Sequence, residues 1–278
     1  MMASMQELFA RRRDAALDGL MPANGRNRIA PPDARYPEIE VLLTGEESSW
    51  SISHDLARLL AHQVISSSLT NVIEFGAGLS SLVLATSLSL GPGGRLTSVE
   101  QNPEWCRKYW SRVAALGDVD GRLVESTPRL SVGAAGVCYS FRSAAPVVAS
   151  RGPYDLALVD GPQGFYGRDG ALGMLRGHLA PGALVVLDDA GRSGERWTLL
   201  RCLVTSRGYE LASYNKDFGG RGCALLRWNG DTRVRPSALA ALSSALQAVR
   251  YWRGRMDSGP RLKEWMRGRG CRGAGDSA

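Results

Sequence analysis

Residues 72–81 have the sequence Val-Ile-Glu-Phe-Gly-Ala-Gly-Leu-Ser-Ser. A short apolar run ends here in a glycine-rich turn, and a segment of helical length follows it. Glycine lets the chain turn sharply and lets a ligand approach the main chain, so the pattern predicts a strand, a tight turn and a helix whose amino end faces a ligand. Such a turn serves several classes of nucleotide-binding protein, and the two glycines alone do not distinguish between them.

Further short apolar runs follow this turn, at residues 95–100, 121–125, 155–160 and 183–188. Segments of helical length, such as 80–89 and 103–116, separate most of them. Strands that alternate with helices indicate βαβ units and a parallel sheet with helices on both faces. Two last strands are expected at 209–215 and 223–228, because the glycines of residues 218–222 suit a hairpin turn. The sequence therefore predicts one α/β domain over residues 46–230.

Two acidic residues lie at the ends of the first two strands. Glu74 directly precedes the glycine turn, where a carboxylate would repel the pyrophosphate of a dinucleotide. The same carboxylate would attract the positively charged methionine portion of S-adenosylmethionine, by its ammonium group or through a water molecule. Glu100 ends the second strand, 22 residues after Gly78, where an acid can accept hydrogen bonds from both hydroxyls of a ribose. The pair favours an adenosyl ligand with a cationic end.

These segments together resemble the successive motifs of class I S-adenosylmethionine-dependent methyltransferases. The resemblance is carried by Glu74-Phe-Gly-Ala-Gly78, Glu100, residues 155–160 followed by Gly161-Pro162, and Pro181-Gly-Ala-Leu-Val-Val-Leu-Asp-Asp189. It covers residues 50–229, and the motif pattern is closest to small-molecule O-methyltransferases of the catechol-type and related bacterial group. It implies a Rossmann-like sheet of six parallel strands and one antiparallel strand, with cofactor and substrate at the carboxyl ends of the strands.

The candidate site residues follow from these motifs. The expected cofactor-binding residues are Glu74, Gly76, Ala77, Gly78, Glu100, Gln101 and Asp160. Asp160 and Asp188 are the candidate catalytic residues, because an oxygen nucleophile must lose its proton to a carboxylate or to a metal-polarised site.

Three carboxylates at neighbouring strand ends allow two interpretations. Asp160, Asp188 and Asp189 would form an oxygen-only cluster that suits Mg²⁺ or Ca²⁺, and the catechol-type resemblance implies a metal there. Alternatively, Asp189 caps the helix that begins near Ser193 and pairs with Arg192, while Asp188 orders the loop. The sequence leaves both interpretations open.

Loops outside the motifs are expected to hold the acceptor. The segment 161–170 is expected to form part of the substrate wall, with Tyr166 and Arg168 as candidate contacts. Residues 50–53 are a candidate cover over the methionine end of the cofactor.

Composition limits the other possibilities. No run approaches the roughly 20 apolar residues of a membrane helix, no secretory signal is recognisable, and the five scattered cysteines form no CxxC pair, so a cytoplasmic protein is expected. The net charge is +7, but residues 231–278 hold ten basic against four acidic residues, which leaves the rest of the chain at +1. The basic character thus belongs to residues 231–278, where a carboxy-terminal helix and tail are expected. An extension at residues 1–45 and the domain at residues 46–230 precede them.

The sequence therefore predicts an enzyme that moves a methyl group from S-adenosylmethionine to an oxygen or nitrogen of a small molecule. Three alternatives remain: an RNA methyltransferase that uses the basic tail, an NAD-dependent oxidoreductase, and a protein that kept the fold without the chemistry.

Overall fold

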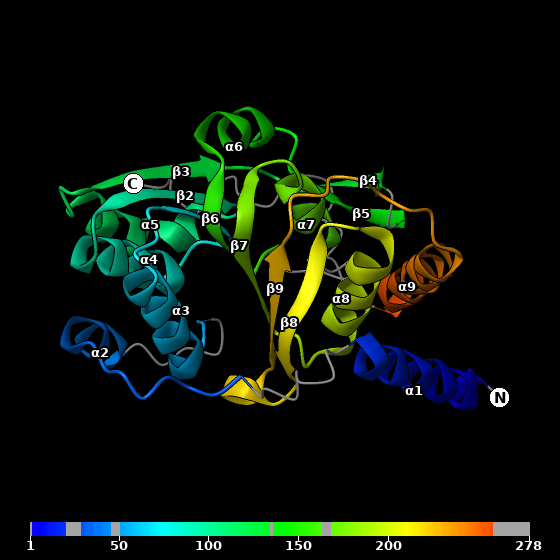
Figure 1. Cartoon of the computed structure of the whole chain (residues 1–278). Coiled ribbons are helices and arrows are strands. Elements are labelled where there is room, and N and C mark those ends of the chain that lie inside the picture. The colour runs from blue at the N-terminus through cyan, green and yellow to red at the C-terminus, as the bar shows by residue number, and fades with distance from the viewer. Residues whose placement is uncertain (1, 21–28, 46–50, 134–135, 163–167, 258–278) are drawn as a thin grey trace, which may run out of the picture.

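A seven-stranded sheet forms the centre of the computed structural model, which describes residues 2–20, 29–45, 51–133, 136–162 and 168–257 (Figure 1). The strand order is β3-β2-β1-β6-β7-β9-β8. Their bounds are β1 Asn71–Phe75, β2 Gly94–Glu100, β3 Val119–Glu125, β6 Tyr154–Val159, β7 Leu179–Asp188, β8 Tyr209–Asn215 and β9 Cys223–Trp228. A separate hairpin consists of β4 Arg129–Gly133 and β5 Gly136–Ser140.

One strand of the sheet runs against the other six. β9 is antiparallel to both of its neighbours, β7 and β8, while β3, β2, β1, β6 and β7 pair in parallel. The predicted arrangement of six parallel strands and one antiparallel strand is therefore confirmed. β8 ends at the lower edge of the sheet in Figure 1, where the short helix η1 (Phe218–Gly220) connects it to β9.

Helices cover both faces of the sheet, because alternate residues of each strand point to opposite sides. Ile73 and Phe75 of β1 belong to one hydrophobic cluster, and Val72 belongs to the other. The helices are α1 Met2–Leu20, α2 Pro37–Leu43, α3 His54–Ser66, α4 Leu79–Leu90, α5 Pro103–Ala114, α6 Ala145–Arg151, α7 Asp169–Leu175, α8 Ser193–Thr205 and α9 Ala238–Asp257. The first cluster extends to α1, α6, α7 and α8, and the second to α2, α3, α4 and α5.

Three parts of the fold were not anticipated. The helix α2 begins at Pro37 within an expected loop, and proline is well suited to the first turn of a helix because its missing N–H is not needed there. The hairpin β4–β5 and the helix α6 occupy much of a segment, residues 129–151, for which no regular structure was expected.

Both ends of the described chain pack against the sheet domain. Leu17 of α1 is buried in the first cluster, and the buried side chain of Arg13 donates a hydrogen bond of 2.9 Å to Ser193 Oγ at the start of α8. On α9, the Ser244 hydroxyl accepts a hydrogen bond of 2.7 Å from Val137 N in β5. The division into segments 1–45, 46–230 and 231–278 stays a prediction. Within the described ranges, no helix is long and apolar enough to span a membrane.

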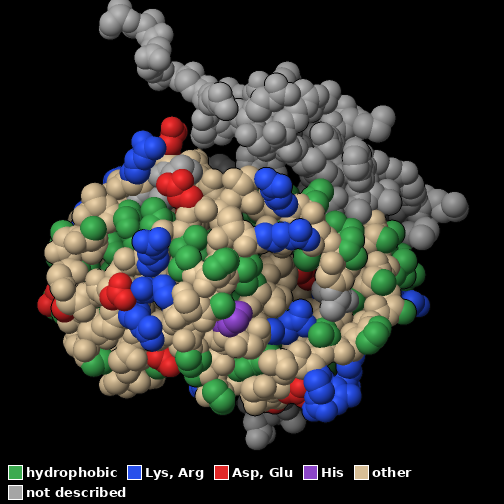
Figure 2. Space-filling view, turned by 90° about the horizontal axis from the view of Figure 1, so that it is seen from above, with side chains coloured by type: hydrophobic (Ala, Val, Ile, Leu, Met, Phe, Trp, Pro, Cys, Tyr) green, Lys and Arg blue, Asp and Glu red, His purple; other side chains and the backbone are tan. Residues whose placement is uncertain are grey.

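Figure 2 shows the face of the molecule seen from above in Figure 1. Among the described residues, the basic side chains visible on this face lie among hydrophobic and neutral ones.

Candidate functional site

The glycine turn after β1 lies directly against the loop after β6. Gly76 has a φ of +97°, and a Cβ atom on it would lie 2.9 Å from the backbone nitrogen of Gly161. The Gly161 N–H in turn donates a hydrogen bond of 2.5 Å to the carbonyl oxygen of Phe75. Both positions require glycine, because the two backbones touch where a side chain would otherwise stand.

Glu74 lies beneath this turn and has no exposed surface. Its two carboxylate oxygens accept hydrogen bonds of 2.5 Å from Ser98 Oγ and 2.6 Å from Ser80 Oγ. Burial raises the pKa of Glu74 to about 7, although the serine hydroxyls act in the opposite direction. Through these contacts Glu74 joins β1, β2 and the start of α4. Its expected attraction of the ligand stays a prediction.

Glu100 connects the turn to the next loop. One of its oxygens accepts a hydrogen bond of 2.8 Å from Ala77 N, and the other accepts hydrogen bonds of 2.7 Å from Gln101 N and 2.6 Å from Asn102 N. Burial raises the pKa of Glu100, and the negative charge of Asp160 raises it further. The oxygen that accepts the Ala77 N–H has a second lone pair, so Glu100 can still accept one hydroxyl group of a ligand.

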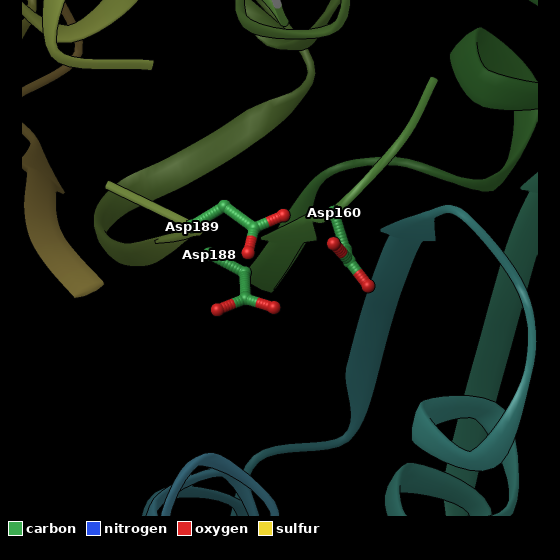
Figure 3. Close-up of side chains that lie close together, drawn as sticks. All are labelled: Asp160, Asp188 and Asp189. Atoms are coloured by element: carbon green, nitrogen blue, oxygen red, sulfur yellow. The ribbon is translucent and has the colours of Figure 1, made fainter. Parts of the chain in front are cut away.

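Three aspartates gather where β6 and β7 end (Figure 3). One oxygen from each of Asp160, Asp188 and Asp189 lies within 4.8 Å of the others. Asp160 follows β6, Asp188 ends β7, and Asp189 has a φ of +56°, a left-handed conformation that aspartate adopts more readily than most residues. The convergence expected from the strand ends is thus present.

Arg168 reaches into this cluster. Its side chain is only 3% exposed, and Nη2 donates hydrogen bonds of 2.9 Å to Asp160 Oδ1 and 2.8 Å to Asp189 Oδ2. Nη1 donates to the carbonyl oxygens of Val159, at 3.3 Å, and Asp188. Arg168 was expected as a substrate contact; its guanidinium is buried among protein groups in this structure, and the contact stays a prediction. The other candidate of this loop, Tyr166, lies outside the described residues.

Asp188 differs electrostatically from its two neighbours. Burial, with the added repulsion of Asp160, raises the pKa of Asp188 to about 7. Its Oδ2 is buried without a hydrogen-bond partner among the described residues, whereas Asp160 and Asp189 are both ion-paired with Arg168. Asp188 is therefore the carboxylate best placed to exchange a proton near neutral pH.

The alternative interpretation had Asp189 pair with Arg192 and cap the next helix instead of binding a metal, and only the ion pair is present. Arg192 Nη1 lies 2.9 Å from Asp189 Oδ2, as the expected ion pair requires. The expected capping is absent: α8 has no side-chain cap at Arg192, and the Asp189 backbone carbonyl, not its carboxylate, accepts the Arg192 N–H at 2.8 Å.

A segment before α3 also reaches the aspartate loop. The carbonyl oxygen of Ser51 accepts a hydrogen bond from Arg221 Nη2, and Arg221 Nε lies 3.9 Å from Asp189 Oδ1. Ser51 Oγ is buried without a hydrogen-bond partner in the described part of the chain. Residues 50–53 were expected as a cover for the cofactor, and Trp50 lies outside the described residues. Arg221 was not predicted as a site residue, because its only signal in the sequence was its place in the glycine-rich turn.

Comparisons with known proteins agree with this architecture. Residues 73–190 match a family model described as a methyltransferase domain. No curated protein sequence matches the chain.

Two solved structures share the fold. The O-methyltransferase TomG of Streptomyces achromogenes, solved with S-adenosylmethionine, is 17% identical with a TM-score of 0.50, and the match covers 71% of this chain and 92% of TomG. An O-methyltransferase of Bacillus cereus, solved with S-adenosylhomocysteine, is 15% identical with a TM-score of 0.51, covering 70% of this chain and 92% of that one. The predicted class I methyltransferase fold is confirmed, and the alternative of an oxidoreductase has no support.

Proposed function

We propose that this class I S-adenosylmethionine-dependent methyltransferase transfers a methyl group to an oxygen atom of a small-molecule acceptor. The family model supports the reaction, and both structural neighbours are described as O-methyltransferases. The observation that carries the proposal is the buried, unpaired Oδ2 of Asp188 at the carboxyl end of β7, beside the loop that touches the glycine turn.

Cofactor binding is assigned to the turn and to the end of β2. The turn of Gly76, Ala77 and Gly78 lies beside Glu100, which accepts from Ala77 N and is held in place by three backbone N–H groups in all. Gln101 Oε1 is buried with no hydrogen-bond partner among the described residues, which leaves an acceptor for a ligand donor. Glu74 contributes by holding the shape of the turn.

Asp188 is the proposed general base. S-adenosylmethionine supplies an electrophilic methyl group when it is bound, and the acceptor must bring an oxygen in line with it. A carboxylate with a pKa of about 7 can accept the proton of an acceptor hydroxyl near neutral pH. Asp160 is ion-paired with Arg168. It raises the pKa of both Glu100 and Asp188, so it lies between the cofactor residues and the base. Alignment of the reactants supplies much of the rate, up to about 7–11 kcal/mol in ideal cases.

The three aspartates do not fit a bound Mg²⁺. Asp160 Oδ1 and Asp189 Oδ2 already accept hydrogen bonds from Arg168, and a cation beside a buried guanidinium would be repelled. We therefore assign no step of the reaction to a metal. The same proposal takes residues 46–230 as the catalytic unit of a cytoplasmic enzyme, with the two ends of the chain as extensions.

Calorimetry with S-adenosylhomocysteine tests the cofactor site. Wild-type protein should bind it, and Glu100→Ala should bind roughly 10- to 100-fold more weakly, because a charge-assisted hydrogen bond to the ligand is lost. Glu125→Ala is the matched control, since Glu125 ends the neighbouring strand β3 in register with Glu100 but is exposed. Undetectable binding to the wild type, or equal weakening by both substitutions, contradicts the proposal.

The acceptor is sought with radiolabelled S-adenosylmethionine and a panel of phenols, catechols, aliphatic alcohols and amines. Label transferred to hydroxyl compounds and lost in Asp188→Asn supports the proposal. Transfer to amines alone contradicts the oxygen acceptor. Binding without transfer over the whole panel would indicate a protein that has lost the chemistry.

A further inference from the structure

We propose that the guanidinium group of Arg168 takes the place of a divalent cation among Asp160, Asp188 and Asp189 and excludes a metal from the site. Arg168 is then a positioning residue, which holds two of the acids and leaves the third free. The role in catalysis rests on the proposed function, whereas the exclusion of metal can be measured without it.

The contacts of Arg168 match what a bridging cation would do. It joins the ends of β6 and β7 through one carboxylate from each side, Asp160 at 2.9 Å and Asp189 at 2.8 Å. It also satisfies the carbonyl oxygens of Val159 and Asp188, the last residues of the two strands. A single guanidinium group therefore pairs with a carboxylate after each strand and donates hydrogen bonds to the last carbonyl oxygen of each strand.

The position of Arg168 is fixed from the neighbouring residue. Asp169 begins α7 and forms a buried two-point ion pair with Arg201 of α8, with distances of 2.9 Å and 2.6 Å. Thr198 Oγ1 donates a third hydrogen bond of 3.1 Å to the same carboxylate. Because residue 169 is anchored in this way, the side chain of residue 168 is held on the opposite side, toward the aspartates.

The arrangement selects among the three acids. Asp160 and Asp189 are ion-paired with Arg168, and Asp189 also pairs with the half-exposed Arg192. Asp188 forms no ion pair within the described ranges, and its Oδ2 has no hydrogen-bond partner there. A metal would coordinate all three acids, whereas the arginine leaves Asp188 outside the ion pairs. Two oxygens of the cluster have no hydrogen-bond partner in the described part of the chain, Asp188 Oδ2 and Asp189 Oδ1, and the second lies 3.9 Å from Arg221 Nε.

Electron paramagnetic resonance of Mn²⁺, a common substitute for Mg²⁺, tests the exclusion. Wild-type protein should leave the signal of aqueous Mn²⁺ undiminished. Arg168→Met removes the cation and keeps an apolar stem of similar length, so it should bind one equivalent of Mn²⁺ at the uncompensated acids. Arg168→Lys restores a positive charge and should again exclude the metal. Arg192→Met is the matched control, because it removes a cation paired with Asp189 but leaves Arg168 in place, and it should not bind.

Circular dichroism and S-adenosylhomocysteine calorimetry on each variant report folding and the cofactor site separately. Stoichiometric binding of Mn²⁺ to the wild type, lost in Asp189→Asn, overturns the proposal, and this measurement does not depend on whether Arg168→Met folds. Absence of binding by folded Arg168→Met overturns it as well. Failure of S-adenosylhomocysteine to bind would instead refute the proposed function and leave the result with Mn²⁺ valid.

Discussion

Replacing Glu74 by glutamine should make the protein more stable at alkaline pH and change little at acid pH. Glu74 is fully buried, and its pKa rises from an ordinary value of 4.5 to about 7. Because the folded pKa lies above the unfolded one, the folded protein binds the proton more tightly. The free energy of unfolding therefore falls as pH rises from about 4.5 to about 7, and the loss is complete above that range.

The size of the effect follows from the pKa difference. At about 1.4 kcal/mol for each pH unit, the ionised form of Glu74 costs about 3 kcal/mol above pH 7. Glutamine has nearly the same shape and never ionises. Its amide can accept a hydrogen bond from one of Ser80 and Ser98 and donate one to the other, because each hydroxyl can both donate and accept. Glu74→Gln should thus gain about 3 kcal/mol relative to wild type at pH 8 and about zero at pH 4.5.

Urea denaturation at these two pH values measures the difference. Glu125→Gln, at the exposed end of β3, is the control and should stay within about 0.5 kcal/mol of wild type at both. A difference for Glu74→Gln that does not change with pH would refute the assigned pKa. Calorimetry on the same variant distinguishes the two roles of Glu74: retained binding of S-adenosylhomocysteine indicates the structural role, and lost binding by a folded variant indicates direct attraction of the ligand.

Further predictions concern the turn, the base and the ion pairs. Gly76→Ala should lower stability by about 1–3 kcal/mol and abolish S-adenosylhomocysteine binding, while Gly182→Ala, which has a similar φ but open space, should lower stability only modestly and bind normally in calorimetry. Asp188→Asn should bind the cofactor product yet transfer methyl groups about 10²- to 10⁴-fold more slowly, and the wild-type rate should rise as pH passes through about 7; an unchanged rate excludes it as base. Arg201→Met should cost about 3–5 kcal/mol in urea denaturation, because it leaves a buried carboxylate unpaired. Arg233→Met breaks an ion pair at the surface and should cost much less stability than Arg201→Met, so equal losses would contradict this distinction.

The sheet was predictable because most of its strands are short, mainly apolar runs between turns, and the central strand β1 is buried along its whole length. Residues 71–75, 209–215 and 223–228 were expected as strands, and β1, β8 and β9 have those bounds. The shorter elements were not predictable in this way. α2 and α6 have seven residues each, which is too few for a helical period to stand out.

In the site, too, some features could be predicted from the sequence and others could not. Acids at the ends of neighbouring parallel strands must meet at one edge of the sheet, so the convergence of Asp160, Asp188 and Asp189 followed from the topology. The direction of each side chain did not. Glu74 turns inward to two serines whose proximity depends on how α4 and β2 pack. Arg168 turns inward because its neighbour in sequence is tied to α8, a contact that no local pattern encodes.

The buried cluster that joins α1, α7 and α8 to the sheet has a practical meaning for truncated proteins. It contains Leu17, Leu199 and Trp228, all of which lie outside the residues 73–190 that match the family model. A fragment trimmed to the matched residues would lose β8 and β9 and leave one side of β7 without its neighbouring strand. An unpaired, apolar strand of that kind promotes aggregation. The segment recognised by sequence similarity is therefore smaller than the smallest piece of this chain that can be expected to remain folded and soluble.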